Sequence, residues 1–112
     1  MNLSDEKILR GLLSIYLLRE MCIKPRYGYE LNREVTEKIG VELPKGTVYV
    51  LLKNLKNKGL IENEGSCEED HQKTVIYRIT DNGHEFVKSH YHALRLARGM
   101  IDDILMTIDN NL

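Results

Sequence analysis

The segment from Thr47 to Lys58 combines side chains that can read the edges of base pairs. Asn pairs well with adenine, Lys with guanine, and an apolar group with the methyl of thymine. Apolar residues recur in this segment at helical spacing, which predicts a helix that buries Val48, Leu51, Leu52 and Leu55. The opposite face of that helix would present Tyr49, Val50, Lys53, Asn54 and Asn57 to a major groove.

Residues at the start of this expected helix favour a phosphate group. Lys45, Gly46 and Thr47 lie where free backbone N–H groups and the helix dipole attract an anion, and glycine permits close approach. From Leu43 to Lys58 the chain has four lysines and no acidic residue. One of these lysines, Lys56, is therefore placed with the residues that face phosphates.

The overall charge hides this local excess. Sixteen Lys and Arg residues oppose seventeen Asp and Glu residues, which gives a formal net charge of −1 over 112 residues. From Lys24 to Lys58, however, eight basic residues oppose four acidic ones, so the remainder of the chain is acidic. Such separation is typical of a surface that faces phosphates. A solvated lysine face without a partner, or one that meets an acidic protein, is the alternative.

Helix signals before this segment place it in a larger arrangement. A serine followed by two acidic residues predicts a first helix from about Asp5 to Met21. A short amphipathic helix is expected from Tyr27 to Lys38, with Gly40 placed to end it. Pro44 is expected to open the third helix at its favoured first position, and this helix should end before Gly59.

Two strands are expected after the third helix. Leu60–Ile61 begins the first strand, and Thr74 to Ile79 is rich in β-branched and aromatic residues, which predicts an antiparallel partner. The polar stretch from Gly65 to Lys73 is expected to be the loop between them. Helix, helix, turn, helix and a two-stranded ribbon is the order of a winged helix-turn-helix.

Two helices carry more apolar surface than the core of one subunit needs. A long helix, capped by Thr80 or Asp81, should continue to about Ile108, and its apolar positions form a heptad seam typical of packing against another long helix. The first helix is apolar around most of its girth, so it needs cover on two sides. A homodimer supplies this cover, with a predicted interface at Leu9, Leu13, Tyr16, Leu94, Ala97, Ile101, Ile104 and Ile108. Packing of the seam on the first helix of the same subunit is the alternative.

Several motifs in order resemble the PadR family of transcriptional regulators. They are Tyr27–Leu31, Lys45–Leu55, Gly59–Ile61 and Tyr77–Gly83, and the resemblance covers residues ~8 to 90. It implies a winged-helix homodimer that binds operator DNA, usually as a repressor, with dimerisation through the first and C-terminal helices. The family's DNA-contacting segment then corresponds here to Lys45, Gly46, Thr47, Tyr49 and Lys53, with Tyr29 at the start of the preceding helix.

The sequence departs from the family pattern in two places. Val50 stands where the family often has proline, a change that should leave the helix intact. The wing is acidic, because Glu68, Glu69 and Asp70 are consecutive where members commonly carry basic residues. We expect Gln72 and Lys73 to touch DNA while the acidic tip points away; low affinity until the acids are neutralised is the alternative.

Enzyme and metal functions find little support in the sequence. The histidines do not form a metal-ligand set, and Cys67 with His71 offers two ligands in a loop. The sequence has no nucleophile with a recognisable base, no phosphate loop and no dinucleotide fingerprint, so we expect neither catalysis nor a cofactor. Cys22 and Cys67 form no CxxC pair and are expected to be reduced, with a disulfide or a redox role for Cys67 left open.

These patterns together predict a mainly α fold with a small β-ribbon in one compact domain. Residues 1–80 would form a winged helix-turn-helix DNA-binding region, and residues 81–112 a C-terminal helix for dimerisation. The expected function is that of a sequence-specific DNA-binding transcriptional regulator, a repressor that acts as a homodimer on a pseudo-palindromic operator. A winged-helix protein–protein interaction module is the alternative.

The expected partners are double-stranded DNA and a second copy of the chain. A small-molecule effector at the dimer interface is left open, and no cofactor is expected. Charged residues interrupt the longest apolar stretch, Ile8 to Ile23, which argues against a transmembrane span and favours a cytoplasmic protein.

Overall fold

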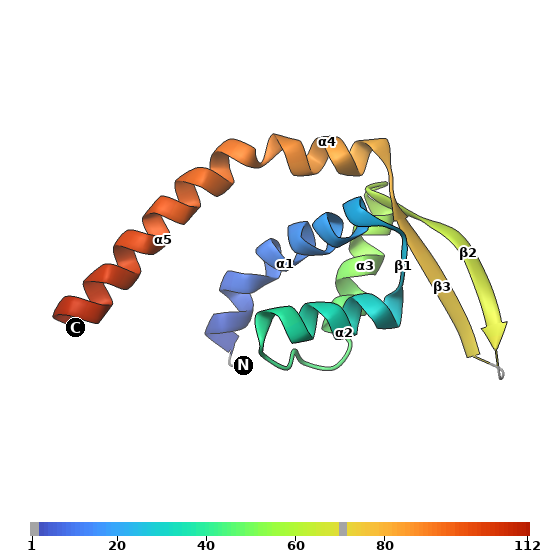
Figure 1. Ribbon diagram of the computed structural model, residues 1–112, viewed down its shortest axis with the longest axis horizontal. Helices are drawn as coiled ribbons and strands as arrows, with labels where there is room; N and C mark the ends of the chain where they lie inside the picture. Colours follow the sequence, from blue (N-terminus) through green and yellow to red (C-terminus); the bar gives the residue numbers. More distant parts are fainter. Residues whose placement is uncertain (1–2, 70–71) are drawn as a thin grey trace.

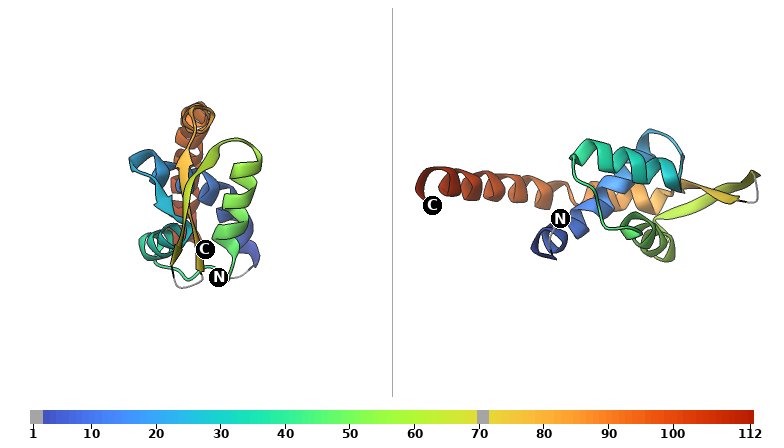
Figure 2. Two further views of the ribbon diagram at one scale, coloured as in Figure 1. Left: turned by 90° about the vertical axis from the view of Figure 1, so that its right-hand side faces the viewer. Right: turned by 90° about the horizontal axis from the view of Figure 1, so that it is seen from below.

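The computed structural model describes residues 3–69 and 72–112, with side chains over residues 8–63 and 75–112. A body of packed helices carries a β-ribbon on one side and a projecting helix on the other (Figures 1 and 2), so the molecule measures 55 × 29 × 21 Å. This arrangement confirms the predicted winged helix-turn-helix with a C-terminal helix. The elements are α1 (Leu3–Ile23), β1 (Arg26–Tyr27), α2 (Gly28–Ile39), α3 (Thr47–Asn57), β2 (Ile61–Glu69), β3 (Gln72–Ile79), α4 (Asp81–Ser89) and α5 (Tyr91–Asn111).

The hydrophobic core lies where α1, α2, α3 and the base of the sheet meet. Leu17 and Leu18 of α1, Leu31 of α2 and Leu52 of α3 are fully buried. Each buried leucine contributes roughly 1.5–3 kcal/mol relative to an exposed one, so these four residues anchor the three helices to one another. The leucine-rich face predicted for the third helix is therefore the face that packs.

Helix α1 is covered on one side. Leu13 and Met21 join the core, whereas Ile8 is 76% and Leu12 is 46% exposed. We expected this helix to be covered on two sides. In the single chain, one of its apolar sides is therefore still open.

Helix α2 ends as expected, but α3 begins later than expected. Gly40 has a φ of 71°, and its N–H donates to the carbonyl of Thr36 at 3.1 Å, which closes α2. The prediction that Pro44 opens the third helix is wrong. Gly46 has a φ of 85°, a left-handed conformation that interrupts a right-handed helix, so α3 starts at Thr47.

The sheet has three strands, in the order β1-β3-β2, and both pairings are antiparallel. Strand β1 was not predicted, because two residues are too short for an alternating pattern. It pairs Arg26 with Tyr77 and Tyr27 with Ile76, and thereby attaches the start of α2 to the middle strand. The register between β2 and β3 shifts between Asn63 and Gly65, which marks a β-bulge near the base of the ribbon.

The prediction of a loop over residues 65–73 is wrong for most of its length. Strand β2 continues to Glu69 and β3 starts at Gln72, with Glu68 opposite Lys73. Backbone groups make the ladder, so polar side chains do not prevent strand pairing in a ribbon. The acid predicted at the wing tip, Asp70, and its neighbour His71 lie outside the described residues.

A network of hydrogen bonds joins the end of α3, the sheet and the start of α4. The Thr80 hydroxyl donates to the carbonyl of Gly59 at 2.7 Å and accepts from the N–H of Gly83 at 3.1 Å. Thr80 also donates its own N–H to the carbonyl of Leu60 at 3.1 Å. Of the two caps predicted for this helix, Thr80 is the one that the structure uses.

The expected continuous helix from residue 81 to about residue 108 is wrong, because the helix breaks at His90. The N–H of His90 donates to the carbonyl of Val87 at 3.2 Å instead of following the α-helical pattern to Phe86. The Phe86 carbonyl accepts from the side chains of Ser89 and His90 instead, each at 2.7 Å. Two side chains thus replace one backbone donor, and α5 leaves at an angle to α4 (Figure 1).

A buried carboxylate joins α1 to α2 and β1. Glu20 is 0% exposed, and its Oε1 lies 2.7 Å from Nζ of Lys38 and 2.8 Å from a guanidinium nitrogen of Arg19. Arg26, also buried, lies 3.8 Å from Oε2 of Glu20 and 3.0 Å from a carboxylate oxygen of Glu34. These ion pairs hold α2 against α1 at the base of the helix-turn-helix.

Candidate nucleic-acid interface

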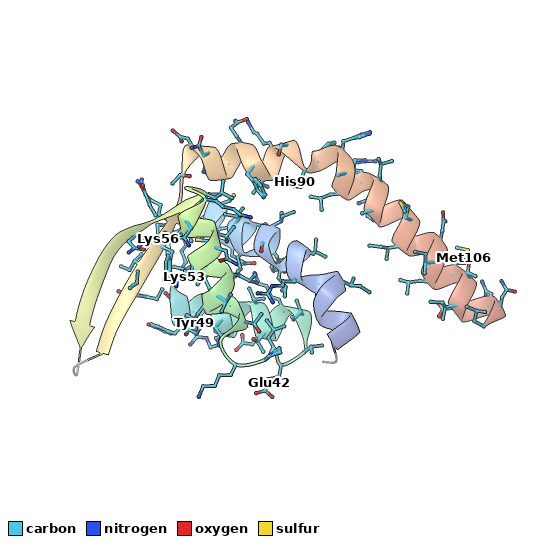
Figure 3. All side chains as sticks on the ribbon, turned by 180° about the vertical axis from the view of Figure 1, so that it is seen from behind. Glu42, Tyr49, Lys53, Lys56, His90 and Met106 are labelled. Atoms are coloured by element: carbon cyan, nitrogen blue, oxygen red, sulfur yellow. The ribbon has the colours of Figure 1, made fainter. Side chains whose placement is uncertain are left out.

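Helix α3 has the two faces that its sequence predicts. The side chains of Val48, Leu51, Leu52 and Leu55 are buried. Tyr49 and Val50 are each 47% exposed. Figure 3 shows Tyr49, Lys53 and Lys56 following one another along the helix. The predicted polar face is exposed throughout: Lys53, Asn54, Lys56 and Asn57.

The start of α3 partly matches the predicted phosphate site. Lys45 is exposed, and Gly46 and Thr47 are half-buried beside it. The N–H of Thr47 already donates to the carbonyl of Pro44 at 3.1 Å, so this amide is not one of the free donors that we expected. The Lys45 ammonium and the positive end of the helix dipole remain to attract an anion here.

Tyr29 is the second residue of α2. Its ring is 49% exposed and stacks on Tyr27, with ring centroids 5.4 Å apart and an angle of 15° between the planes. The carboxylate of Glu30 accepts from the N–H of Tyr27 at 3.0 Å, which fixes the first turn of α2.

A polar groove runs between α2 and the loop that leads to α3. Among its lining residues, Lys45, Gly46 and Tyr49 were predicted to contact DNA. Asn32, Arg33 and Thr36 line the α2 side of the groove and were not predicted from the sequence. Asn32, Arg33 and Thr36 follow Tyr29 by three, four and seven residues, and this spacing was the signal available, because it places them on the same side of a helix.

The two predicted wing contacts are located by backbone register. Gln72 and Lys73 begin β3, opposite Glu69 and Glu68 of β2. Their side chains, like the others between residues 64 and 74, lie outside the part of the chain whose side chains are described.

The residues predicted for a dimer interface form two separate apolar surfaces. On α1, Leu9, Leu13 and Tyr16 line a groove of about 260 Å³ together with Leu12, Ile39 and Val41. On α5, Leu94 and Ala97 are half-buried, and Ile101, Ile104 and Ile108 are 48%, 55% and 45% exposed. Helix α4 packs on α1, with Val87 against the core, so the intramolecular alternative holds for the first part of the seam.

Other kinds of site have little basis among the described residues. They contain no group of three His, Cys, Asp or Glu side chains that could hold a metal ion. The thiol of Cys22 lies 3.7 Å from Nδ1 of His84, which gives two ligands at most. No described helix is both long and apolar enough to cross a membrane.

Comparison with known proteins agrees with this geometry. The model of the "Transcriptional regulator PadR-like family" matches residues 15–89, more than half of the chain. The chain belongs to the PadR-like family. A Lysinibacillus sphaericus protein described as uncharacterized is 32% identical to this PadR-like protein over 82 residues, which are 71% of this chain and 75% of that one.

Solved structures share the fold of this PadR-like protein. A Thermoplasma acidophilum protein described as a transcriptional regulator is 43% identical, with a TM-score of 0.81 over 91% of this chain and 96% of that chain. A PadR family regulator from Eggerthella lenta is 24% identical, with a TM-score of 0.73 over 90% and 88% of the two chains. Both structures are described as transcriptional regulators, and the family to which this chain belongs consists of transcriptional regulators and not of enzymes.

Proposed function

We propose that this PadR-like protein binds double-stranded DNA with sequence preference, as a homodimer, and represses transcription. The observation that carries the proposal is the exposed face of α3, where lysines and amides stand opposite a buried leucine face. Such a face suits a major groove because it offers donors and acceptors to base edges while the helix is held from behind. A dimer bound across a promoter would block access of polymerase.

The charges near α3 supply the sequence-independent part of the binding. Lys45, Lys53, Lys56 and Lys58 are exposed on a segment without acids. Each lysine that neutralises a phosphate releases counterions, so affinity should fall steeply with salt. The acidic remainder of the chain limits non-specific binding and leaves recognition to α3.

The apolar face of α5 supports the dimer. Ile101, Ile104 and Ile108 are about half exposed although they follow a heptad spacing, and α5 lies away from α1 in the single chain (Figure 1). A second copy would cover this face with its own α5 and with the groove on α1. On this proposal, residues 1–80 carry the DNA interface and residues 81–112 join the two copies.

The groove on α1 suits a side chain of a second copy better than a free ligand. Its volume of about 260 Å³ is below the ~300–1,000 Å³ of typical ligand pockets. Its six lining residues include one hydroxyl, that of Tyr16, and no charged group to orient an effector. An effector would therefore bind between the two copies, where their apolar surfaces meet.

The dimer would place each α3 in one of two successive major grooves on the same side of the duplex, about 34 Å apart. The two half-sites would then be related by pseudo-twofold symmetry, because the two copies are. A change in the angle between the copies would alter this spacing and hence the affinity.

A salt-titrated binding measurement tests the proposal. The full chain is titrated with the DNA upstream of its own gene and with an unrelated duplex of equal length, at several salt concentrations. We expect tighter binding to the upstream DNA at every salt concentration and a steep salt dependence with both duplexes. Equal affinity for the two duplexes at modest salt would refute sequence-specific regulation and favour an acidic protein as the partner of the lysine face.

A further inference from the structure

Gly28, the first residue of α2, is needed for space and not for backbone conformation. The glycines with positive φ in the described chain are Gly40, Gly46 and Gly59, and Gly28 is not among them. A Cβ at Gly28 would lie 3.2 Å from Cε1 of Tyr49, closer than the ~3.5–4.0 Å of an ordinary carbon contact. The ring of Tyr49 therefore packs directly on Gly28 and would have to shift by a few tenths of an ångström to admit a methyl group there.

A second tyrosine borders the same space from the sheet. Cε2 of Tyr77 would lie 3.4 Å from a Cβ at Gly28. Burial raises the pKa of the Tyr77 hydroxyl, and the neighbouring Tyr49 raises it further. Tyr77 is on the middle strand, opposite Arg26 of β1 and Asn63 of β2, at the bulge where the ribbon begins.

The two tyrosines differ in what they leave exposed. Tyr77 is half-buried at the base of the ribbon, whereas Tyr49 keeps 47% of its surface exposed on the polar face of α3. An exposed ring on a helix surface usually samples several rotamers, and ordering it on binding costs free energy. A ring already packed on Gly28 avoids part of this cost.

We propose that Gly28 is a specificity-determining residue of the DNA interface, because it forms a seat that holds the Tyr49 ring in one orientation towards the bases. Tyr77 borders this seat from the wing. The inference rests on the proposed function, since it requires α3 to enter a major groove. The seat affects the recognition of bases and not the electrostatic attraction to phosphates, because no lysine takes part in it.

A side chain at position 28 should change the discrimination between duplexes without changing the affinity for an unrelated duplex, whereas a general loss of folding would lower both. A methyl group at position 28 would displace the Tyr49 ring by a few tenths of an ångström and leave the lysines of α3 in place. Contacts to bases depend on the exact position of the Tyr49 ring, whereas contacts to phosphates are made by the lysines, which do not move. Discrimination between duplexes should therefore fall while affinity for an unrelated duplex is kept.

The experiment compares Gly28→Ala with Gly99→Ala in the full chain. Gly99 is also helical, and a Cβ there would meet nothing within 4 Å. A preferred duplex is first selected by the wild-type protein from a randomised pool, and the Kd for that duplex and for a scrambled one is then measured. We expect the ratio of the two Kd values to fall about tenfold in Gly28→Ala, the size of one lost base contact, and to stay unchanged in Gly99→Ala.

A double-mutant cycle with Tyr49→Leu isolates the contact. Once the ring is removed, Gly28→Ala should leave the Kd ratio unchanged. If Gly28→Ala alone does not fold, restoration of folding by Tyr49→Leu supports the seat, and failure to fold in both backgrounds overturns it.

Three further results would overturn the proposal. They are an unchanged Kd ratio in Gly28→Ala, an equal loss of affinity for both duplexes, and the same effect of Gly28→Ala with and without Tyr49. A wild-type protein that selects no duplex at all would instead refute the proposed function, and the seat with it.

Discussion

The ammonium group of Lys38 lies 2.7 Å from Oε1 of Glu20, a carboxylate with no exposed surface. Lys38 is in the last turn of α2 and Glu20 is near the end of α1, so this ion pair joins the two helices. Replacing Lys38 by methionine would leave the buried charge of Glu20 with one fewer donor. We expect the free energy of unfolding to fall by about 1–2 kcal/mol in urea denaturation, less than for a fully buried pair because Lys38 is 42% exposed.

The matched control for this substitution is Lys88→Met. Lys88 lies 3.8 Å from Glu85 on α4, and both side chains are about three-quarters exposed. We expect little change in stability, because exposed pairs of this kind contribute little. Equal losses from the two substitutions would mean that the buried carboxylate does not depend on Lys38.

Glu20 should also make stability depend on pH. Burial alone would raise the pKa of its carboxyl, but hydrogen bonds and charge from Lys38 and Arg19 outweigh burial and hold the pKa below its ordinary value of 4.5. The stabilisation is therefore complete above pH 4.5 and is lost as the pH falls through the lower pKa of the folded state. In thermal unfolding at pH 7 and pH 3, Glu20→Gln should lose less stability on acidification than the wild type. A loss at least as large in the variant would assign the acid sensitivity to other groups.

Gly83 should tolerate no side chain, although it lies inside a helix. A Cβ there would overlap the carbonyl oxygen of Leu60 and lie 2.5 Å from Cγ1 of Ile79. We expect Gly83→Ala to lower the free energy of unfolding by about 2–3 kcal/mol, through displacement of α4 from the sheet. Gly99→Ala, the control in open space, should raise stability by up to about 1 kcal/mol through helix propensity. A neutral Gly83→Ala would show that α4 shifts without cost.

Lys53 is predicted to matter for DNA binding and not for folding. It is exposed at the middle of the polar face of α3 (Figure 3). Lys53→Ala should weaken binding to the preferred duplex by about 1–3 kcal/mol with an unchanged melting temperature. Lys88→Ala, on α4, is the charge-matched control and should bind as the wild type does. Equal binding by Lys53→Ala and wild type would place the interface on another face.

Ile104 is predicted to lie at the centre of the contact between two copies. Its side chain is 55% exposed on the seam of α5. Ile104→Glu would bury an unpaired charge in that contact, so the dimer dissociation constant should rise at least about 100-fold in sedimentation equilibrium. His92→Glu introduces the same charge outside the seam and should leave the association unchanged. A variant Ile104→Glu that still dimerises would move the interface away from α5.

The sequence predicted those elements that follow from period and from local signals. The leucines of α3 recur at helical spacing. Gly40 ends α2 through its left-handed backbone conformation, and Thr80 begins α4 through its side-chain cap, so both signals are local. What it missed depends on tertiary or competing contacts. Strand β1 exists because β3 lies beside it, and the break at His90 arises because two side chains take the Phe86 carbonyl from the backbone.

The same distinction applies to the candidate site. The polar residues of α3 were evident from their separation from the leucine face. The seat of Tyr49 was not evident, because Gly28 and Tyr77 are 21 and 28 positions away and meet Tyr49 through packing alone. The α2 side of the polar groove was missed for a similar reason. Which residues of α2 line the groove depends on the path of the loop between α2 and α3, and that path is a matter of tertiary packing.

Because the helix breaks at His90, α5 projects from the body of the molecule, and a small change of angle at the break would move its far end by a larger distance (Figure 3). With 21 residues at about 1.5 Å each, α5 is about 31 Å long. A swing of about 10° at His90 would therefore move its far end by about 5 Å, whereas successive base pairs of DNA are about 3.4 Å apart. In a dimer joined through α5, the hydrogen bonds of Ser89 and His90 would fix the angle at the break and hence the distance between the two α3 helices. Binding would then be sensitive to the insertion or deletion of a single base pair between half-sites.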